Sequence, residues 1–389
     1  MRRSTDLPLG TTRGVLFASL LLGCSADPDP AVARNTGETS NVASVISRLD
    51  PVAAEPAPVA PAAIPPSVAG SASRVGSERC PMGPFNTPLP TAPVVLKVLT
   101  PPPDTSGSFS WEGAVWIGDS LYWSEIGSGD GPPPARIHRF TPGSQSFTPG
   151  LIQNTGSNGL AVDGQGNLVA ATHDTGGIAT FALSTGARGQ FGGPNAQMFN
   201  GQRFIAPNDL VLRSDGNLYF TDARFRGPAH APQNGMTRVY RVSPEGNVSV
   251  VEAGLVNPNG ITLSPDGATL YVSASSGTGL RSYALDATGS AGNGVDVPLN
   301  PPLDAPDGMA VDCAGNIYAT EHEARRITVL TAQGELIGSF GGRQVFDSDI
   351  NNLAFGGADG RTLFITTAIE GTTRGGLYAV QLAVPGLPY

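Results

Sequence analysis

Apolar and polar residues alternate with a period of two in six segments of the chain that resemble one another. Each begins with Glu, Asn or Asp, turns through Gly beside Asp or Asn, and continues into a second apolar run; the segments are 112–125, 158–172, 208–222, 259–273, 307–321 and 351–366. Two alternating runs joined by a Gly-containing turn predict a β-hairpin. The segments begin 44 to 51 residues apart. The chain therefore contains an internal repeat of paired strands.

Further apolar runs extend each hairpin. A third run follows every hairpin, as at 136–140 and 326–331, and a fourth is visible in several repeats, as at 248–254. Four strands in each repeat of about 45–50 residues are typical of a β-propeller. We therefore predict an all-β fold, a six-bladed β-propeller of four-stranded blades over residues 91–389. We expect 94–100 to supply the outer strand of the last blade, which would close the ring and remove an open sheet edge.

The N-terminus has a different pattern. Arg2 and Arg3 precede an apolar run at 15–22, which Gly23 and Cys24 follow. A basic start and an apolar core of about 7–15 residues are typical of a secretory signal. Leu21-Leu22-Gly23-Cys24 resembles a bacterial lipoprotein box, in which the cysteine is lipidated; a plain secretory signal is the alternative.

This pattern divides the chain into three parts. Residues 1–23 are predicted to be a signal peptide, and 24–90, which include a run rich in Pro and Ala, a lipidated disordered tether before the propeller. We expect an exported lipoprotein anchored in a membrane and facing the periplasm or the cell surface. If Cys24 is lipidated, Cys80 and Cys313 remain, either as a disulfide or as two free thiols.

Composition narrows the class of partner. Charged residues make up 14% of the chain, which excludes a coiled coil, and the net charge is −9. Nucleic acids and anionic membrane surfaces bind basic patches. We therefore expect no nucleic-acid partner, membrane contact only through the lipid anchor, and a monomer.

Rotational repetition places equivalent residues on a circle. The residues that open the innermost strands should share one end of the central channel; they are Glu112, Asn158, Asn208, Asn259, Asp307 and Asn351. All carry a side-chain oxygen and two are carboxylates, a set that suits a hard divalent cation, calcium before Zn, Mg or Mn. Asn-Gly and Asp-Gly pairs also form turns, but that alternative does not explain Glu112.

Five of the repeats contain segments that resemble the SMP-30/gluconolactonase/luciferin-regenerating-enzyme family over roughly residues 95–389. The segments are Glu112-Gly-Ala-Val-Trp116, Pro207-Asn-Asp-Leu210 with Asp215-Gly-Asn-Leu-Tyr-Phe-Thr-Asp222, Pro258-Asn-Gly260, Pro306-Asp-Gly-Met309 and Asn352-Leu-Ala-Phe-Gly-Gly357. The resemblance implies a six-bladed propeller with one divalent metal at the channel mouth, commonly calcium, bound by Glu112, Asn208, Asn259 and Asp307. It places Asn158 behind these ligands and argues against Asn351. It also implies lactone hydrolysis.

The predicted function is therefore a metal-dependent hydrolase of a lactone or related cyclic ester. Asp307 is the candidate general base and Glu112 the second candidate. Asn158, Arg203 and His173 are candidates for substrate binding. The sequence leaves open a different class, a non-catalytic lipid-anchored propeller that binds a glycan or a protein and holds a structural metal.

Two departures from the family leave the substrate open. The loop from Ala223 to His230 and Thr172 replace the usual residues near the expected pocket rim. We also expect the last residues of the second strands to join this rim, although hydrogen bonding within the blade is the simpler expectation for Asp222; they are Glu125, Thr172, Asp222, Ala274, Glu321 and Thr367.

Overall fold

The computed structural model describes residues 80–90, 95–101, 108–127, 135–225, 237–274, 278–370 and 373–387. The predicted signal peptide, Cys24 and the tether up to residue 79 lie outside the described residues, as does most of the loop that ends at His230. In the described part of the chain, no helix is long and apolar enough to cross a membrane.

The described residues form antiparallel sheets joined by short turns. Four sheets contain four strands each, and consecutive strands pair in chain order. They are β6 Ser157–Val162, β7 Leu168–Thr172, β8 Gly177–Phe181 and β9 Arg188–Gln190; β10 Pro207–Leu212, β11 Leu218–Asp222, β12 Arg238–Val242 and β13 Val248–Glu252; β14 Pro258–Leu263, β15 Thr269–Ala274, β16 Leu280–Ala284 and β17 Val295–Asp296; and β18 Pro306–Val311, β19 Ile317–Glu321, β20 Arg326–Leu330 and β21 Leu336–Gly341.

A fifth sheet contains eight strands. It joins β2 Ser108–Ile117, β3 Ser120–Gly127, β4 Ala135–Thr141 and β5 Ser146–Ile152 to β22 Ile350–Gly356, β23 Thr362–Glu370, β24 Leu377–Gln381 and β1 Leu96–Leu99. The two halves meet where residues 108–110 of β2 pair with 368–370 of β23. The described helices are two short 3-10 turns, η1 Pro142–Ser144 and η2 Pro194–Gln197.

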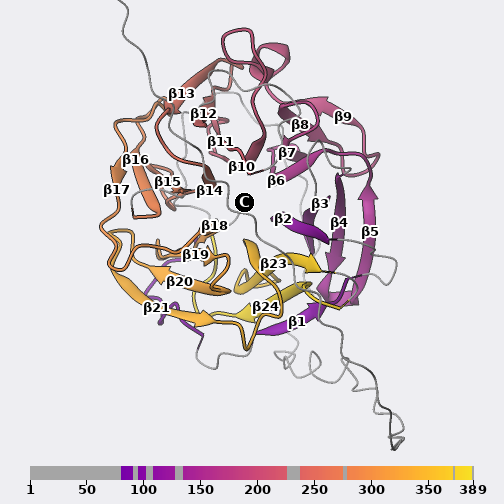
Figure 1. Ribbon diagram of the computed structural model, residues 1–389, viewed down its shortest axis with the longest axis vertical. Coiled ribbons are helices and arrows are strands. Elements are labelled where there is room, and N and C mark those ends of the chain that lie inside the picture. The colour runs from indigo at the N-terminus through magenta and orange to yellow at the C-terminus, as the bar shows by residue number, and fades with distance from the viewer. Residues whose placement is uncertain are drawn as a thin grey trace, which may run out of the picture. The chain divides into compact units, whose positions relative to one another are not determined.

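The sheets lie around a common centre (Figure 1). Their first strands β2, β6, β10, β14, β18 and β22 contact one another in this order, and β22 contacts β2. The strands paired farthest from these, such as β9, β13, β17 and β21, lie at the periphery. Four-stranded sheets arranged in this way are typical of a β-propeller.

The first and last described strands meet in the eight-stranded sheet. β1 pairs with β24 and so lies on the outside of β22, β23 and β24. Lys97 of β1 forms an ion pair with Asp347, Nζ to Oδ2 2.7 Å, and its ammonium lies over the ring of Tyr378. The prediction that the run 94–100 supplies this strand is confirmed.

Apolar side chains fill the spaces between neighbouring sheets. In one such cluster, Val169 and Ile178 of the second repeat pack with Phe204, Phe220 and Tyr240 of the third. Equivalent clusters join the other neighbours. Burial of one large apolar side chain contributes about 1.5–3 kcal/mol to the stability of the fold. The apolar positions that alternate along the strands thus also account for the packing of one sheet against the next.

Residues 80–90 are attached to the sheet of β18–β21. Cys80 forms a disulfide with Cys313, in the turn between β18 and β19, with 5.4 Å between the Cα atoms. The hydroxyl of Tyr318 donates to the carbonyl of Pro88, and Leu89 packs against the cluster that contains Tyr318. Of the two alternatives left open by the sequence, the structure has the disulfide. The predicted boundary at residue 90 thus lies at the end of a segment bound to the fold.

Replacing both Cys80 and Cys313 with Ser should lower the free energy of unfolding by about 2–5 kcal/mol, because the disulfide restricts the unfolded chain. Urea denaturation of the oxidised protein and of this variant measures the difference. Reduced wild-type protein should match the variant; equal stability of the oxidised and reduced forms would contradict the prediction.

Candidate functional site

The six ring residues expected from the sequence lie near the start of the innermost strands. They are Glu112, Asn158, Asn208, Asn259, Asp307 and Asn351. In each strand the pairing register with the second strand shifts at or directly after this residue, as between Pro306 and Met309. Bulges of this kind re-aim a side chain away from the sheet.

Glycine allows neighbouring innermost strands to approach closely beside two of these residues. A Cβ atom on Gly260 would lie 2.3 Å from the carbonyl oxygen of Asp307, and one on Gly308 would lie 2.5 Å from Cγ of Asn352. No other residue fits such a contact. The glycines that follow Asn259 and Asp307 therefore bring successive ring residues side by side.

Four of the ring residues form one continuous row of hydrogen bonds. The amide of Asn158 donates to Asn208, the amide of Asn208 donates to Asn259, and Asn259 donates to the carboxylate of Asp307. The oxygens of three predicted ligands, Asn208, Asn259 and Asp307, thus lie within hydrogen-bonding reach of their neighbours. The row ends at a carboxylate, which accepts hydrogen bonds when ionised.

Asp307 is mostly buried, with 14% of its side chain exposed. Burial raises the pKa of Asp307 to about 6, although the nearby His322 and the hydrogen bond from Asn259 act in the opposite direction. Nδ1 of His322 lies 3.7 Å from Oδ2 of Asp307 and 3.0 Å from the carbonyl oxygen of Ile350. On the other side of its imidazole, Nε2 of His322 lies 3.8 Å from Oδ2 of Asp349.

Glu112 is half-buried on β2, next to the strand that carries Asn158. The preceding residue, Trp111, is fully buried, and its carbonyl accepts a hydrogen bond of 3.1 Å from Nδ2 of Asn351. The side-chain oxygen of Asn351 is buried and has no hydrogen-bond partner. Asn351 therefore holds the backbone directly before Glu112.

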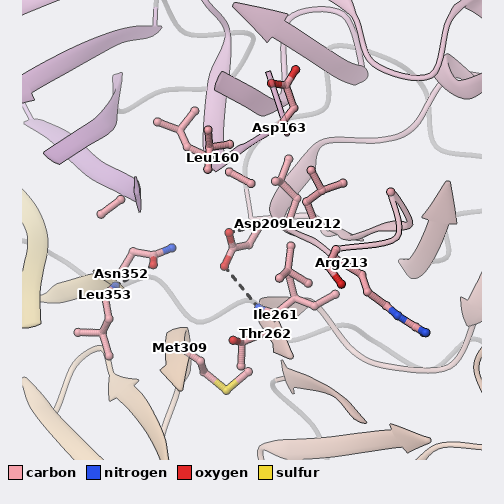
Figure 2. A pocket seen from close by; sticks show the side chains of 18 of the residues that line it. Leu160, Asp163, Asp209, Leu212, Arg213, Ile261, Thr262, Met309, Asn352 and Leu353 are labelled. Carbon is pink, nitrogen blue, oxygen red and sulfur yellow. Dashed lines mark hydrogen bonds between the residues drawn. The ribbon is translucent and has the colours of Figure 1, made fainter. Parts of the chain in front are cut away.

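The innermost strands carry two larger side chains where others have glycine. Asp209 and Asn352 are both buried, hydrogen bond to each other, and point toward one another from opposite sides of a pocket in Figure 2. This pocket, a cavity of about 400 Å³, is lined by them and by residues farther along the strands, such as Ile261 and Met309, but by none of the six ring residues. Asp209 and Asn352 thus separate the ring from the cavity.

Asp209 is held in this partition by the backbone. Its carboxylate accepts hydrogen bonds from the amides of Leu210, at 2.9 Å, and Ile261, at 3.4 Å. Burial, with a smaller contribution in the same direction from the negative charge of Asp307, raises the pKa of Asp209 to about 7. The sequence contains no signal for this partition beyond the two non-glycine residues after Asn208 and Asn351.

The predicted substrate-binding residues lie at different depths. His173 is buried, with Nε2 3.4 Å from Nδ2 of Asn158. Arg203 is exposed and donates to the carbonyl of Thr175 at 2.9 Å. The structure therefore brings His173 against Asn158, the first residue of the row, whereas Arg203 lies on the loop before β10.

The residues expected at the rim are all buried. They lie at or near the ends of the second strands, at the same end as the ring, since Glu125 pairs with Trp111 and Glu321 with Pro306. Asp222 accepts from the amides of Ile205 and Ala206, so the hydrogen-bonding expectation is confirmed for it.

The donor set of the ring suits a cation that prefers oxygen. Glu112, Asn208, Asn259 and Asp307 offer two carboxylates and two amide oxygens, and the unpartnered oxygen of Asn351 lies in the next position of the ring. Within the described residues, no group of three or more His, Cys, Asp and Glu side chains lies together. Zinc favours nitrogen and sulfur ligands, whereas amide and carboxylate oxygens such as those of the ring fit calcium.

Known lactonases are similar to this chain over most of their length. Gluconolactonase of Zymomonas mobilis is 29% identical over 316 residues, which cover 72% of this chain and 82% of that protein. Pentonolactonase XacC of Haloferax volcanii is 28% identical over 297 residues, 71% of this chain and 92% of that protein.

A solved structure and a family also match. The gluconolactonase XC5397 from Xanthomonas campestris superimposes with a TM-score of 0.60 at 26% sequence identity, covering 74% of this chain and 89% of that one. The family described as the SMP-30/gluconolactonase/LRE-like region matches residues 111–369, which span every ring residue. The chain belongs to the SMP-30/gluconolactonase/LRE-like family.

Proposed function

We propose that this protein hydrolyses a lactone or related cyclic ester with the help of one divalent cation, calcium first, bound at the ring of Glu112, Asn208, Asn259 and Asp307. The relatives named gluconolactonase and pentonolactonase support lactone hydrolysis. The observation that carries the site is the continuous row of side-chain amides that ends at the buried carboxylate of Asp307.

When bound, the cation would supply Lewis-acid polarisation of the lactone carbonyl. Glu112 and Asp307 would provide its negative ligands, and Asn208 and Asn259 neutral ones. The amide of Asn158 supports this set from the side, because it donates to Asn208. The buried partition of Asp209 and Asn352 closes the ring from the cavity behind it and keeps that side of the site free of bulk water.

Asp307 is the proposed general base. Its carboxylate would take a proton from the water molecule that attacks the carbonyl carbon of the lactone. It would return this proton to the ester oxygen of the lactone when the bond between that oxygen and the carbonyl carbon breaks, which leaves a hydroxy acid. A base is most effective when its pKa lies near the working pH; burial raises the pKa of Asp307 to about 6 before a cation binds, and the charge of a bound cation would lower it. Glu112 is the second candidate.

Substrate contacts, assembly and location belong to the same proposal. His173, beside Asn158, and Arg203 would contact substrate oxygens.

We count the eight-stranded sheet as two blades of a six-bladed propeller, because its halves β2–β5 and β22–β24 with β1 each repeat the four-strand pattern. The Cys80–Cys313 disulfide supports export to an oxidising compartment, in line with a lipoprotein attached through Cys24 and acting as a monomer.

Calcium should stabilise the protein and be required for turnover. At a concentration a hundred times its Kd, a ligand that binds only the folded state raises the free energy of unfolding by about 2.7 kcal/mol. Thermal unfolding and hydrolysis of a panel of sugar lactones, each measured with calcium and with a chelator, check both effects. Stabilisation without turnover would favour the non-catalytic binding propeller, and turnover unaffected by the chelator would contradict metal dependence.

Replacing Asp307 with Asn should lower kcat about 10²–10⁴-fold, because the amide cannot accept the proton. The amide oxygen can still bind a cation, so calorimetry with calcium separates this loss from metal loss. Asp359→Asn is the matched control, because it makes the same chemical change at an exposed residue in the turn between β22 and β23, and it should retain kcat. Full activity of Asp307→Asn would reject Asp307 as the base.

A further inference from the structure

Buried carboxylates lie at or near the end of the second strand of alternate repeats around the ring. Glu125 of β3, Asp222 of β11 and Glu321 of β19 are each 1–3% exposed. Each pairs across the sheet with an arginine that begins or nearly begins the third strand; the partners are Arg136, Arg238 and Arg326. The intervening repeats have Thr172, Ala274 and Thr367 at this position. The alternation is present in the repeats themselves, and the cross-strand register adds the arginine opposite each carboxylate.

Asp222 holds the segment that leads into Asn208. Its two carboxylate oxygens accept hydrogen bonds from the backbone amides of Ile205, at 3.0 Å, and Ala206, at 2.8 Å. These amides lie two and three residues before Asn208. The carboxylate of Asp222 thus holds the backbone directly before the ring residue Asn208.

Glu321 does the same for Asp307. It accepts from the amide of Asp304 at 3.1 Å, and the guanidinium of Arg326 holds both carboxylate oxygens, at 2.9 and 2.7 Å. Ala305, which follows Asp304, has a φ of 44°, a conformation that is costly for a residue with a side chain. The contacts of Glu321 therefore fix a turn two residues before Asp307 that alanine would not adopt by itself.

Glu125 acts through a side chain. Its carboxylate accepts hydrogen bonds from the indole of Trp111, at 2.8 Å, and from Arg136, at 2.6 Å, and His138 lies 3.1 Å away. Trp111 immediately precedes Glu112. Both the indole and the carbonyl of Trp111 are held, the latter by Asn351, so the backbone is fixed directly before Glu112.

We propose that Glu125, Asp222 and Glu321 are positioning residues that hold Glu112, Asn208 and Asp307 in place. This proposal rests on the proposed function, since these are three of the four proposed metal ligands. A buried ion pair is not in itself a source of stability. In this protein each buried carboxylate fixes the backbone before a proposed metal ligand. Replacing a residue that orients a metal ligand typically changes metal affinity 10–100-fold.

The first test compares calcium affinity in matched variants of the full chain. Asp222→Asn and Glu321→Gln keep the side-chain shape but remove an acceptor oxygen. Thr367→Val is the control, because Thr367 occupies the same sheet position before Asn351 and hydrogen bonds to Gly376. Calorimetry with calcium chloride should give a Kd 10–100-fold weaker in the two acidic-residue variants and a wild-type Kd in the control. Wild-type Kd in both folded variants would overturn the proposal.

A second measurement does not need the metal. Amide hydrogen exchange of the chelator-treated protein should speed up in 204–208 only in Asp222→Asn, and in 303–307 only in Glu321→Gln. If Glu321→Gln does not fold, Arg326→Lys removes the two-point contact while keeping the charge, and should show the same local effect. Unchanged exchange in these segments would overturn the positioning role, whereas wild-type protein that binds no calcium would instead refute the proposed function.

Discussion

A methyl group at Gly260 would lie 2.3 Å from the carbonyl oxygen of Asp307, and this close approach of neighbouring innermost strands is the constraint on which the candidate site depends. Each sheet is an ordinary antiparallel one with its apolar residues packed against the next. Neighbouring innermost strands approach this closely where glycine faces the next strand, as at Gly260 and Gly308. This approach brings successive ring residues side by side, and the hydrogen-bonded row from Asn158 to Asp307 follows from it.

The fold could be predicted from the sequence because its signals are local and repeated. Strand alternation and Gly turns recur often enough to identify four strands in a repeat, and the outer strand β1 could be assigned because the last repeat lacks one. Pairing of β2 with β23 was not predictable, since it depends on how far β23 extends beyond the hairpin. The same holds for the attachment of residues 80–90, which involves contacts with residues more than 200 positions away.

The positions of the candidate site were also predictable, but not their surroundings. Equivalent positions in a repeat must share one end of the ring, so the six ring residues followed from counting. The approach of His322 to Asp307 and the partition by Asp209 and Asn352 depend on side chains that break the repeat. Glu125, Asp222 and Glu321 were expected at the correct end, yet they contact the Trp111 indole, the amides of Ile205 and Ala206, and the amide of Asp304 in ways that no period in the sequence encodes.

The Cys80–Cys313 bond has a mechanical consequence. Any tension applied to the chain before residue 80 is divided between the peptide backbone that leads to β1 and a covalent path to the turn between β18 and β19. The chain between the two cysteines, which are 233 positions apart, forms a closed loop that cannot be drawn out by pulling from that side. Load would therefore reach the sheet that carries Asp307 directly, without first peeling β1 from β24.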